Sequence, residues 1–533
     1  MSNGWYQLER NKLKKTAPCL SGRREPGPVT SQAYVPVSIP EPVPAPCPAP
    51  EPQPEPVCAE PPVPAPEPRQ EPAPEPPPKA TQWERPSGAM PDPYGDEGTV
   101  THSQTVGPCG PVVLQDGVLH ETLNTFMDAK RLERAVHAKG WGAFGRFECC
   151  QPMGEHTMLP FLQAAGQQTP TACRFSLAVS NRGTPDASRN VRGFSTKFYT
   201  DAGVFDLLCN HLPVFAVQDA IRFPETIQAL QPSPVNGLID PSRFWDFVAR
   251  APEAIHFVTW LYSDIGTLKS LRHLRAYGVN TYVWKNAKGA RRYVKYHWIP
   301  MAGTQFITAQ ESAALAGDPD IAGRDLYESI RRGECPEYEL RVQLMDPCDA
   351  GDLPFDPLDD TKVWDEARWP LLPVGKLRLE RNPEDYMEQV EKLAFSPNNL
   401  LPGAELSADK MLQGRSFAYW DAQRRRLGPD FRKVPVNRQG NWSPDQVISS
   451  GLGQETAGVQ VRADCPKGDD FTQAGERYRA FTQEERDHLA ENIARELCMA
   501  PEETYRAVLG YLWQADEDYG RAVAQMTERH MGK

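Results

Sequence analysis

The 533-residue sequence predicts an α+β protein, in which an antiparallel barrel or sandwich of strands is followed by a small helical domain and preceded by a proline-rich arm. Three observations predict this fold class. Proline is concentrated near the N-terminus, several central stretches alternate apolar and polar residues, and the last sixty residues repeat apolar residues at helical spacing.

The arm covers residues 1–100 and holds 26 of the 54 prolines. Residues 36–78 consist of Pro-Ala-Pro and Glu-Pro runs with little that could fill a core. We therefore expect a disordered N-terminal arm whose proline runs extend as polyproline II. Such a segment suits the aromatic grooves of SH3 or WW domains, which gives a non-enzymatic alternative: a scaffold that docks a partner through the arm.

The central part of the chain predicts strands and the end predicts helices. Period-two alternation, which marks half-buried strands, occurs in residues 173–179, 193–199, 293–299 and 341–345. Residues 300–335 look more helical, and residues 370–440, rich in Pro, Gly and Asn, predict a long wrapping connection. Leu489, Ile493 and Leu497 begin a series of apolar residues that predicts about three amphipathic helices.

The composition excludes several classes of function. The net charge is −12 and the densest basic cluster, residues 424–433, is short, so we expect no nucleic-acid partner. No apolar run approaches the roughly 20 residues of a membrane span, and the N-terminus lacks the apolar segment of a signal peptide, so we expect no membrane association. The twelve cysteines include no C-x-x-C pair, which favours a cytoplasmic protein with reduced thiols.

One familiar pattern is misleading. Gly140, Gly142 and Gly145 spell the dinucleotide fingerprint G-x-G-x-x-G. That fingerprint must follow a strand and open a helix, whereas residues 132–139 look helical and residues 146–150 look like a strand. The order is reversed, so we reject a Rossmann interpretation.

The most informative local pattern is a polar stripe formed by Arg415, Tyr419, Gln423 and Arg426. Their spacings of four, four and three place them on one face of a helix. An arginine one turn from a tyrosine favours the phenolate, the form that ligates ferric iron. The same residues also fit an ordinary salt-bridged surface helix, so the stripe alone decides nothing.

Two further polar residues have equally plain alternatives. His137, in RAVHAKG, can be a structural histidine. Asn210, in LLCNHLP, can be a turn or capping residue at a strand end.

Longer stretches around these residues resemble the monofunctional haem catalases and occur in the order of that family. They include TVGPCGPVVLQD from Thr105, RAVHAKGWGAFGRFE from Arg134, RGFSTKFYTDAGVFDLLCNHLPVF from Arg192, PVGKLRLERNP from Pro373 and DKMLQGRSFAY ending at Tyr419. The C-terminal DDFTQAGERYRAFTQEERDHLAENIA is similar to the helical segment that ends smaller-subunit members. The resemblance covers roughly residues 101–530.

The resemblance implies an antiparallel eight-stranded β-barrel, a wrapping connection and an α-helical C-terminal domain. The implied domains are the Pro-rich arm 1–100, the barrel core 101–375, the wrapping segment with the proximal haem helix 376–440, and the helical domain 441–533. It also implies disproportionation of hydrogen peroxide to water and oxygen, haem b (iron protoporphyrin IX) as cofactor, and a homotetramer. A haem peroxidase acting on organic donors or hydroperoxides is the enzymatic alternative.

The resemblance also assigns site residues. Tyr419 matches the proximal iron ligand, His137 and Asn210 match the distal residues that exchange protons with peroxide and position it, and Ser176 matches the residue that orients the histidine. The matched cofactor-binding positions are Arg134, Val136, Arg174, Phe215, Phe223, Phe395, Met411, Arg415, Gln423 and Arg426. The three arginines Arg134, Arg174 and Arg426 match positions that bind the haem propionates.

Some positions depart from the family pattern. Asn190 stands where an aspartate usually lines the main channel, Trp420 replaces a proline after the ligand, and His211 replaces an asparagine. The NADPH pattern of smaller-subunit members is partly kept: His256 and Ser263 match. Three other positions differ, occupied here by Ile265, Arg275 and Glu366. NADPH is therefore an optional cofactor for which tight binding is not expected.

Overall fold

The computed structural model describes Leu123, residues 133–438 and residues 468–532. The predicted arm, residues 1–100, lies outside the described residues. The strands of the described part are β1 (Gly140–Cys149), β2 (Gln168–Leu177), β3 (Arg192–Thr200), β4 (Gly203–Asn210), β5 (Ala276–Tyr277), β6 (Tyr282–Lys285), β7 (Arg291–Pro300), β8 (Glu337–Met345), β9 (Leu372–Arg381) and β10 (Ala404–Leu406).

Eight of these strands close a barrel. Neighbouring strands follow the order β5-β4-β3-β2-β1-β9-β8, and β7 closes the ring by pairing with both β5 and β8. Every pair in the ring is antiparallel, and β6 and β10 extend the sheet from β7. The antiparallel eight-stranded β-barrel is therefore confirmed, and the four alternating stretches fall mainly in β2, β3, β7 and β8.

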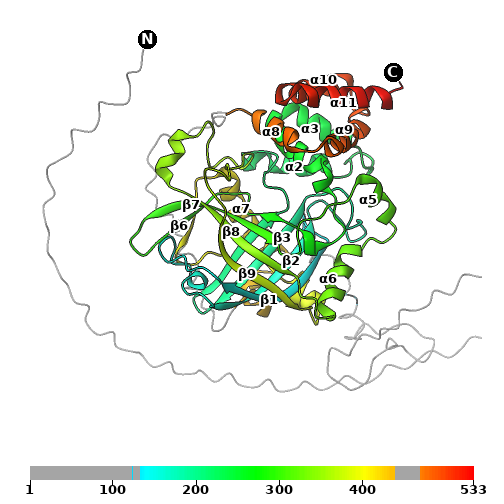
Figure 1. Ribbon diagram of the computed structural model, residues 1–533. Coiled ribbons are helices and arrows are strands. Elements are labelled where there is room, and N and C mark those ends of the chain that lie inside the picture. The colour runs from blue at the N-terminus through cyan, green and yellow to red at the C-terminus, as the bar shows by residue number, and fades with distance from the viewer. Residues whose placement is uncertain (1–122, 124–132, 439–467, 533) are drawn as a thin grey trace, which may run out of the picture. The chain divides into compact units, whose positions relative to one another are not determined.

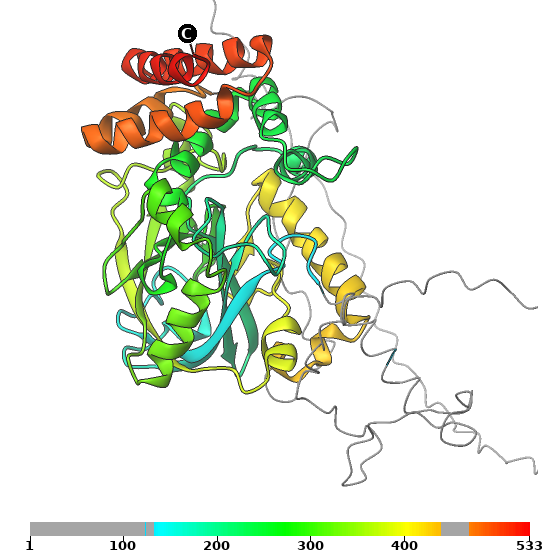
Figure 2. The ribbon, with the colours of Figure 1, turned by 90° about the vertical axis from the view of Figure 1, so that its right-hand side faces the viewer.

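The helices lie around and beyond this barrel (Figure 1). They are α2 (Phe223–Leu230), α3 (Ser242–Arg250), α4 (Ile255–Tyr262), α5 (Ala309–Leu315), α6 (Ile321–Arg331), α7 (Lys410–Leu427), α8 (Thr472–Ala480), α9 (Gln483–Leu497), α10 (Glu502–Ala515) and α11 (Glu517–His530). A π-helical turn spans Met387–Glu391. Figure 2 shows α7 running along the outside of the barrel, with the C-terminal helices gathered at one end.

The inside of the barrel is filled by aromatic side chains. Phe147, Phe161, Phe198 and Trp298 are all at most 1% exposed, and the rings of Phe161 and Phe198 stack with centroids 4.5 Å apart. Burial of each such side chain contributes roughly 1.5–3 kcal/mol. This packed interior makes the barrel a rigid support for residues at its ends and on its outer face.

A second core joins the C-terminal helices to α3 and α4. Trp245 and Tyr262 pack in one buried cluster with Ile493, Leu512 and Tyr519. The three amphipathic helices predicted from Leu489 onward are confirmed as α9, α10 and α11, and α8 precedes them. Within the described ranges, no helix has both the length and the apolar character needed to cross a membrane.

Two details differ from the sequence-based expectation. The stretch 132–139 was predicted to be helical, but its described residues, 133–139, form no helix. Here the chain turns sharply, with a positive φ at His137, and its backbone groups bond to the neighbouring segment instead of to one another. In addition, β9 continues to Arg381, past the boundary predicted at residue 375.

Candidate active site

His137 has an unusual backbone conformation just before β1. Its φ is +59°, a left-handed value that costs a residue with a side chain about 1–3 kcal/mol. Its N–H donates to the carbonyl of Ala178 at 2.9 Å, and the Arg174 guanidinium donates to the carbonyls of His137 and Ala138, both at 3.0 Å. These bonds hold the strained backbone in one conformation.

The imidazole of His137 is equally constrained. Its Nδ1 lies 2.9 Å from the Ser176 hydroxyl, the residue predicted to orient it. Burial, reinforced by the charges of Arg174, Arg415 and Arg134, lowers the pKa of His137 to about 3. The ring is therefore neutral at ordinary pH and can accept a proton.

Asn210 reaches the same place through the register of the sheet. It ends β4 opposite Gly193 of β3, and Gly193 is in turn opposite Ser176 of β2. Directly opposite residues project to the same face of a sheet, so Ser176 and Asn210 share a face. A Cβ on Gly193 would lie 2.8 Å from the Ser176 hydroxyl and 3.0 Å from the His137 ring, so this glycine leaves the room that the imidazole occupies.

Three of the predicted arginines gather around one carboxylate. Arg134 donates to Glu391 at 2.9 Å, and both Arg134 and Arg426 donate to backbone carbonyls of residues 390–393. Burial and then repulsion from Arg174 and Arg426 hold the pKa of Arg134 well below its ordinary value. Burial likewise lowers the pKa of Arg426 to about 10. The cluster has more positive than negative charge and favours an anionic ligand with more than one carboxylate.

The polar stripe predicted around Tyr419 lies on α7. The guanidinium of Arg415 donates to the Tyr419 oxygen at 3.2 Å and also to the side-chain oxygen of Asn280, whose amide donates to Asp409 at 2.8 Å. Burial by itself lowers the pKa of Arg415, but the neighbouring Tyr419 and Tyr282 phenols and Asp409 raise it above its ordinary value. Arg415 is therefore a permanent cation beside the Tyr419 oxygen.

Most of the remaining predicted cofactor-binding residues are apolar. The rings of Phe215 and Phe223 lie 6.1 Å apart, and Phe395 belongs to a buried cluster against which Tyr419 packs. Met411 is 1% exposed, and Val136 is half-buried beside His137 in the chain. Gln423 is buried, accepts from Arg426 at 2.8 Å and donates to the Phe395 carbonyl at 3.2 Å, so it supports the end of the stripe.

These residues fit an iron porphyrin with two carboxylates. A phenol beside a fixed cation provides an iron ligand, the arginines provide partners for the carboxylates, and the phenylalanines provide apolar contacts. The Nε–H groups of Arg174 and Arg415 are buried and have no hydrogen-bond partner, so donors remain to be satisfied in this region.

The residues of the NADPH pattern fit less well. His256 donates from Nδ1 to the Thr361 carbonyl at 2.8 Å and accepts at Nε2 from Trp260 at 3.0 Å, so both ring nitrogens are engaged. Arg275 pairs with Glu366 at 3.1 Å. Both residues line a cavity of about 1070 Å³, but their side chains are bonded to each other, and we assign no NADPH to it.

The departures from the family pattern have structural consequences. The Asn190 amide bonds the backbone of Val179 twice, accepting from its N–H at 3.2 Å and donating to its carbonyl at 2.7 Å. The ring of Trp420 stacks under Arg432, whose guanidinium lies 3.9 Å from the ring centroid.

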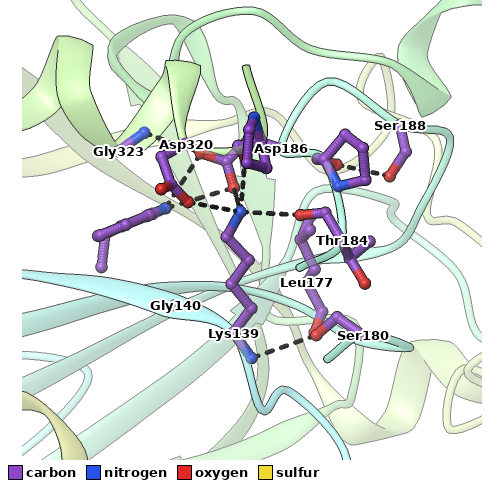
Figure 3. Close-up of polar contacts among 12 residues, drawn as sticks. Lys139, Gly140, Leu177, Ser180, Thr184, Asp186, Ser188, Asp320 and Gly323 are labelled. Carbon is purple, nitrogen blue, oxygen red and sulfur yellow. Dashed lines mark hydrogen bonds and ion pairs between the residues drawn. The ribbon is translucent and has the colours of Figure 1, made fainter. Parts of the chain in front are cut away.

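Sequence inspection missed Lys139, Gly193 and Glu391. Lys139 lies two residues after His137 and is buried in a polar cluster (Figure 3). Isolated Lys and Glu residues resemble ordinary surface charges in a sequence, and a lone glycine in a strand carries little signal. None of the three positions therefore carries a signal in the sequence that separates it from an ordinary surface charge or strand glycine.

Comparisons with known proteins show the family of the chain. Residues 95–460 match the family model "Catalase", and residues 465–527 match "Catalase-related immune-responsive". The chain is 38% identical over 477 residues to a catalase of Capsicum annuum, covering 83% of this chain and 97% of that one. It is also 38% identical over 470 residues to a catalase of Methanosarcina barkeri, covering 82% and 92%.

Solved structures give the same result. A bacterial catalase superposes with a TM-score of 0.76 at 34% identity, covering 84% of this chain and 97% of that one. Catalase A from Saccharomyces cerevisiae superposes with a TM-score of 0.76 at 32% identity, covering 83% and 100%. The chain therefore belongs to the catalase family, whose members are haem oxidoreductases that use hydrogen peroxide as substrate.

Proposed function

We propose that the chain decomposes hydrogen peroxide to water and oxygen with haem b as cofactor, as a smaller-subunit type of catalase. Tyr419 is the iron ligand, and His137 and Asn210 act on the peroxide. The observation that carries this proposal is the state of His137: a half-buried, neutral imidazole on a strained backbone, held at Nδ1 by Ser176 and adjacent to the glycine that faces Asn210.

The chain's own residues supply binding, orientation and proton transfer. With Nδ1–H donated to Ser176, His137 can accept a proton at Nε2 from one peroxide oxygen and return it to the other, which leaves as water as the O–O bond breaks. Bound haem would supply the two electrons for this cleavage, and a second peroxide would return them and leave as oxygen. The Asn210 amide donates a hydrogen bond that holds the peroxide in place.

The arginines and the residues around Tyr419 are proposed to bind the cofactor. Arg134, Arg174 and Arg426 pair with the haem propionates as charge-assisted hydrogen bonds. Arg415 donates to the Tyr419 oxygen and places a positive charge beside this proposed iron ligand. Phe395 and Met411 cover the cofactor on the Tyr419 side.

An absorption spectrum and an oxygen-electrode trace of the purified chain test this proposal. We expect stoichiometric haem and rapid oxygen release, loss of haem in Tyr419→Phe, and haem retention in His137→Ala with turnover lowered about 10²-fold to 10⁴-fold. A haem-loaded protein that releases no oxygen would contradict the proposal. If that protein instead oxidises a phenolic donor, the peroxidase alternative takes its place.

Assembly and the arm need separate experiments. We propose a homotetramer located in the cytoplasm, and sedimentation of the purified chain measures the number of subunits. Deleting residues 1–100 should leave peroxide turnover unchanged, because every assigned site residue lies beyond the arm. A pull-down with SH3 and WW domains, with and without residues 1–100, tests whether the arm is a docking segment.

A further inference from the structure

Lys139 is the centre of a buried polar cluster next to the segment that carries His137 (Figure 3). Its side chain is 5% exposed, and its ammonium lies 3.0 Å from Asp186 and 2.9 Å from Asp320. The same group donates to the carbonyls of Thr184 at 2.8 Å and Pro319 at 2.5 Å. An ammonium has only three N–H groups, so these four oxygen acceptors leave none of them without a partner.

The carboxylate of Asp186 extends this cluster to other elements. It accepts from the backbone N–H of Gly323 on α6 at 3.0 Å and from the Trp141 indole on β1 at 3.2 Å. Its side chain is 5% exposed, whereas that of Asp320 is 45% exposed. The Lys139 and Asp186 pair is therefore the buried part of the cluster, and it ties β1 to α6 and to the loop after β2.

The backbone of Lys139 is fixed as well as its side chain. Its N–H donates to the Ser180 hydroxyl at 3.2 Å, and its carbonyl accepts from Leu177 at 3.1 Å. The N–H of His137, two residues earlier, donates to Ala178. The residue that follows the left-handed turn at His137 on its C-terminal side, Lys139, is thus fixed through both its backbone and its side chain.

A second branch leads from the cluster to Asn210. The Asp186 carbonyl accepts from the Arg192 guanidinium at 2.9 Å, and the Arg192 backbone N–H donates to Nδ1 of His211 at 3.0 Å. His211, which immediately follows Asn210, donates from Nε2 to the Ile265 carbonyl at 3.1 Å. One run of buried polar contacts therefore joins the backbone segments of both distal residues.

We propose that Lys139, paired with Asp186, is a positioning residue that holds His137 in its left-handed conformation and so fixes the imidazole. Within the described residues, Lys139 contacts neither the imidazole of His137 nor the amide of Asn210, so it acts only through the backbone. The role in peroxide chemistry rests on the proposed function, whereas the effect on the His137 backbone does not.

The test uses Lys139→Met together with Asp186→Asn, which removes the buried charges without leaving one unpaired. The first measurement is the rate at which cyanide binds the ferric haem protein, because hydrogen cyanide must lose its proton there and His137 is the base. We expect the rate to fall about 10²-fold, towards that of His137→Ala, with haem content unchanged. The second is amide hydrogen exchange of residues 134–140 in the full chain, expected to be at least tenfold faster.

A matched control removes another ion pair that holds the same helix. Arg272 and Asp325, the latter on α6, pair at 2.8 Å, and Arg272→Met with Asp325→Asn should leave both measurements unchanged. A wild-type cyanide rate and wild-type exchange in the Lys139 double variant would overturn the proposal. So would loss of haem from it, because a pair that only positions His137 leaves Tyr419 and the arginines in place. Should the unaltered chain hold no haem, the proposed function fails, and the exchange measurement alone decides the positioning role.

Discussion

The charge state of His137 is set by the residues that surround it. Burial is the largest cause of its low pKa, and the positive charges of Arg174, Arg415 and Arg134 add to it. Two of these arginines are also proposed partners of the haem propionates, so ligand carboxylates would offset part of their repulsion. Burial would remain, and the imidazole would stay a neutral base.

The pH profile of peroxide turnover follows from this state. We expect kcat/KM to be constant from about pH 5 to about pH 8, because His137 takes up a proton only as the pH falls towards its pKa of about 3. Oxygen release over this pH range measures it. An inflection near pH 6.5 would contradict the assignment. His530→Gln is the control, since that histidine on α11 pairs with Glu491 on α9 and should not affect the profile.

The space left by Gly193 gives a second residue-scale prediction. In Gly193→Ala the new Cβ would lie 3.0 Å from the His137 ring and 2.8 Å from the Ser176 hydroxyl, so the imidazole must move. We expect kcat/KM to fall about 10-fold to 10²-fold with haem content unchanged. Gly510→Ala, on α10 with open space around its Cβ position, should leave activity unchanged. Wild-type activity in Gly193→Ala would show that the imidazole has more room than the structure gives it.

At the scale of elements, the cationic cluster depends on one short π-helical turn. Met387–Glu391 presents the Glu391 carboxylate to Arg134, and the carbonyls that follow it accept from Arg134 and Arg426. Arg134 precedes β1 and Arg426 lies on α7, so the turn joins two elements that are distant in sequence. π-helical turns are often found at functional sites.

Glu391→Gln tests the importance of this turn. Glu391 is 2% exposed and Arg134 is 11% exposed, so the substitution leaves a buried guanidinium without its carboxylate. We expect the free energy of unfolding of the haem-free chain to fall by about 3–5 kcal/mol, and bound haem to restore part of it. Thermal unfolding with and without haem measures both. Glu388→Gln, on the same turn with a surface partner, should change stability by less than about 1 kcal/mol.

Local patterns predicted the strands and α7 because each depends on residues close in sequence. Alternation in residues 293–299 and the stripe from Arg415 to Arg426 needed no knowledge of the fold. The row of Ser176, Gly193 and Asn210 depends on the register of three strands, which no single segment contains. The turn at His137 was mistaken for a helix because the contacts that bend it come from residues 174–180.

At the scale of the whole molecule, the C-terminal helices belong to the same folding unit as the barrel. The described residues 133–438 and 468–532 fall in one compact unit, and α9, α10 and α11 share a buried core with α3 and α4. Hydrogen bonds also join α4 to α9: the Tyr262 hydroxyl donates to Glu496 at 2.5 Å, and the Asn492 amide donates to the Tyr262 carbonyl at 2.9 Å. The two matched family regions are therefore structurally continuous.

A substitution on α10 that leaves a cavity in this shared core should destabilise the haem site as well as the helices. Leu512 is fully buried in the shared core, so Leu512→Ala should lower the free energy of unfolding by about 2–5 kcal/mol. Because the same buried cluster contains Met411 of the proposed haem site, we expect calorimetry and the haem absorption band to report one shared transition at a lower temperature. Met499→Ala, at a residue that is 55% exposed, should shift it little. An early transition that leaves the haem band intact would instead mean that the helices unfold independently of the barrel.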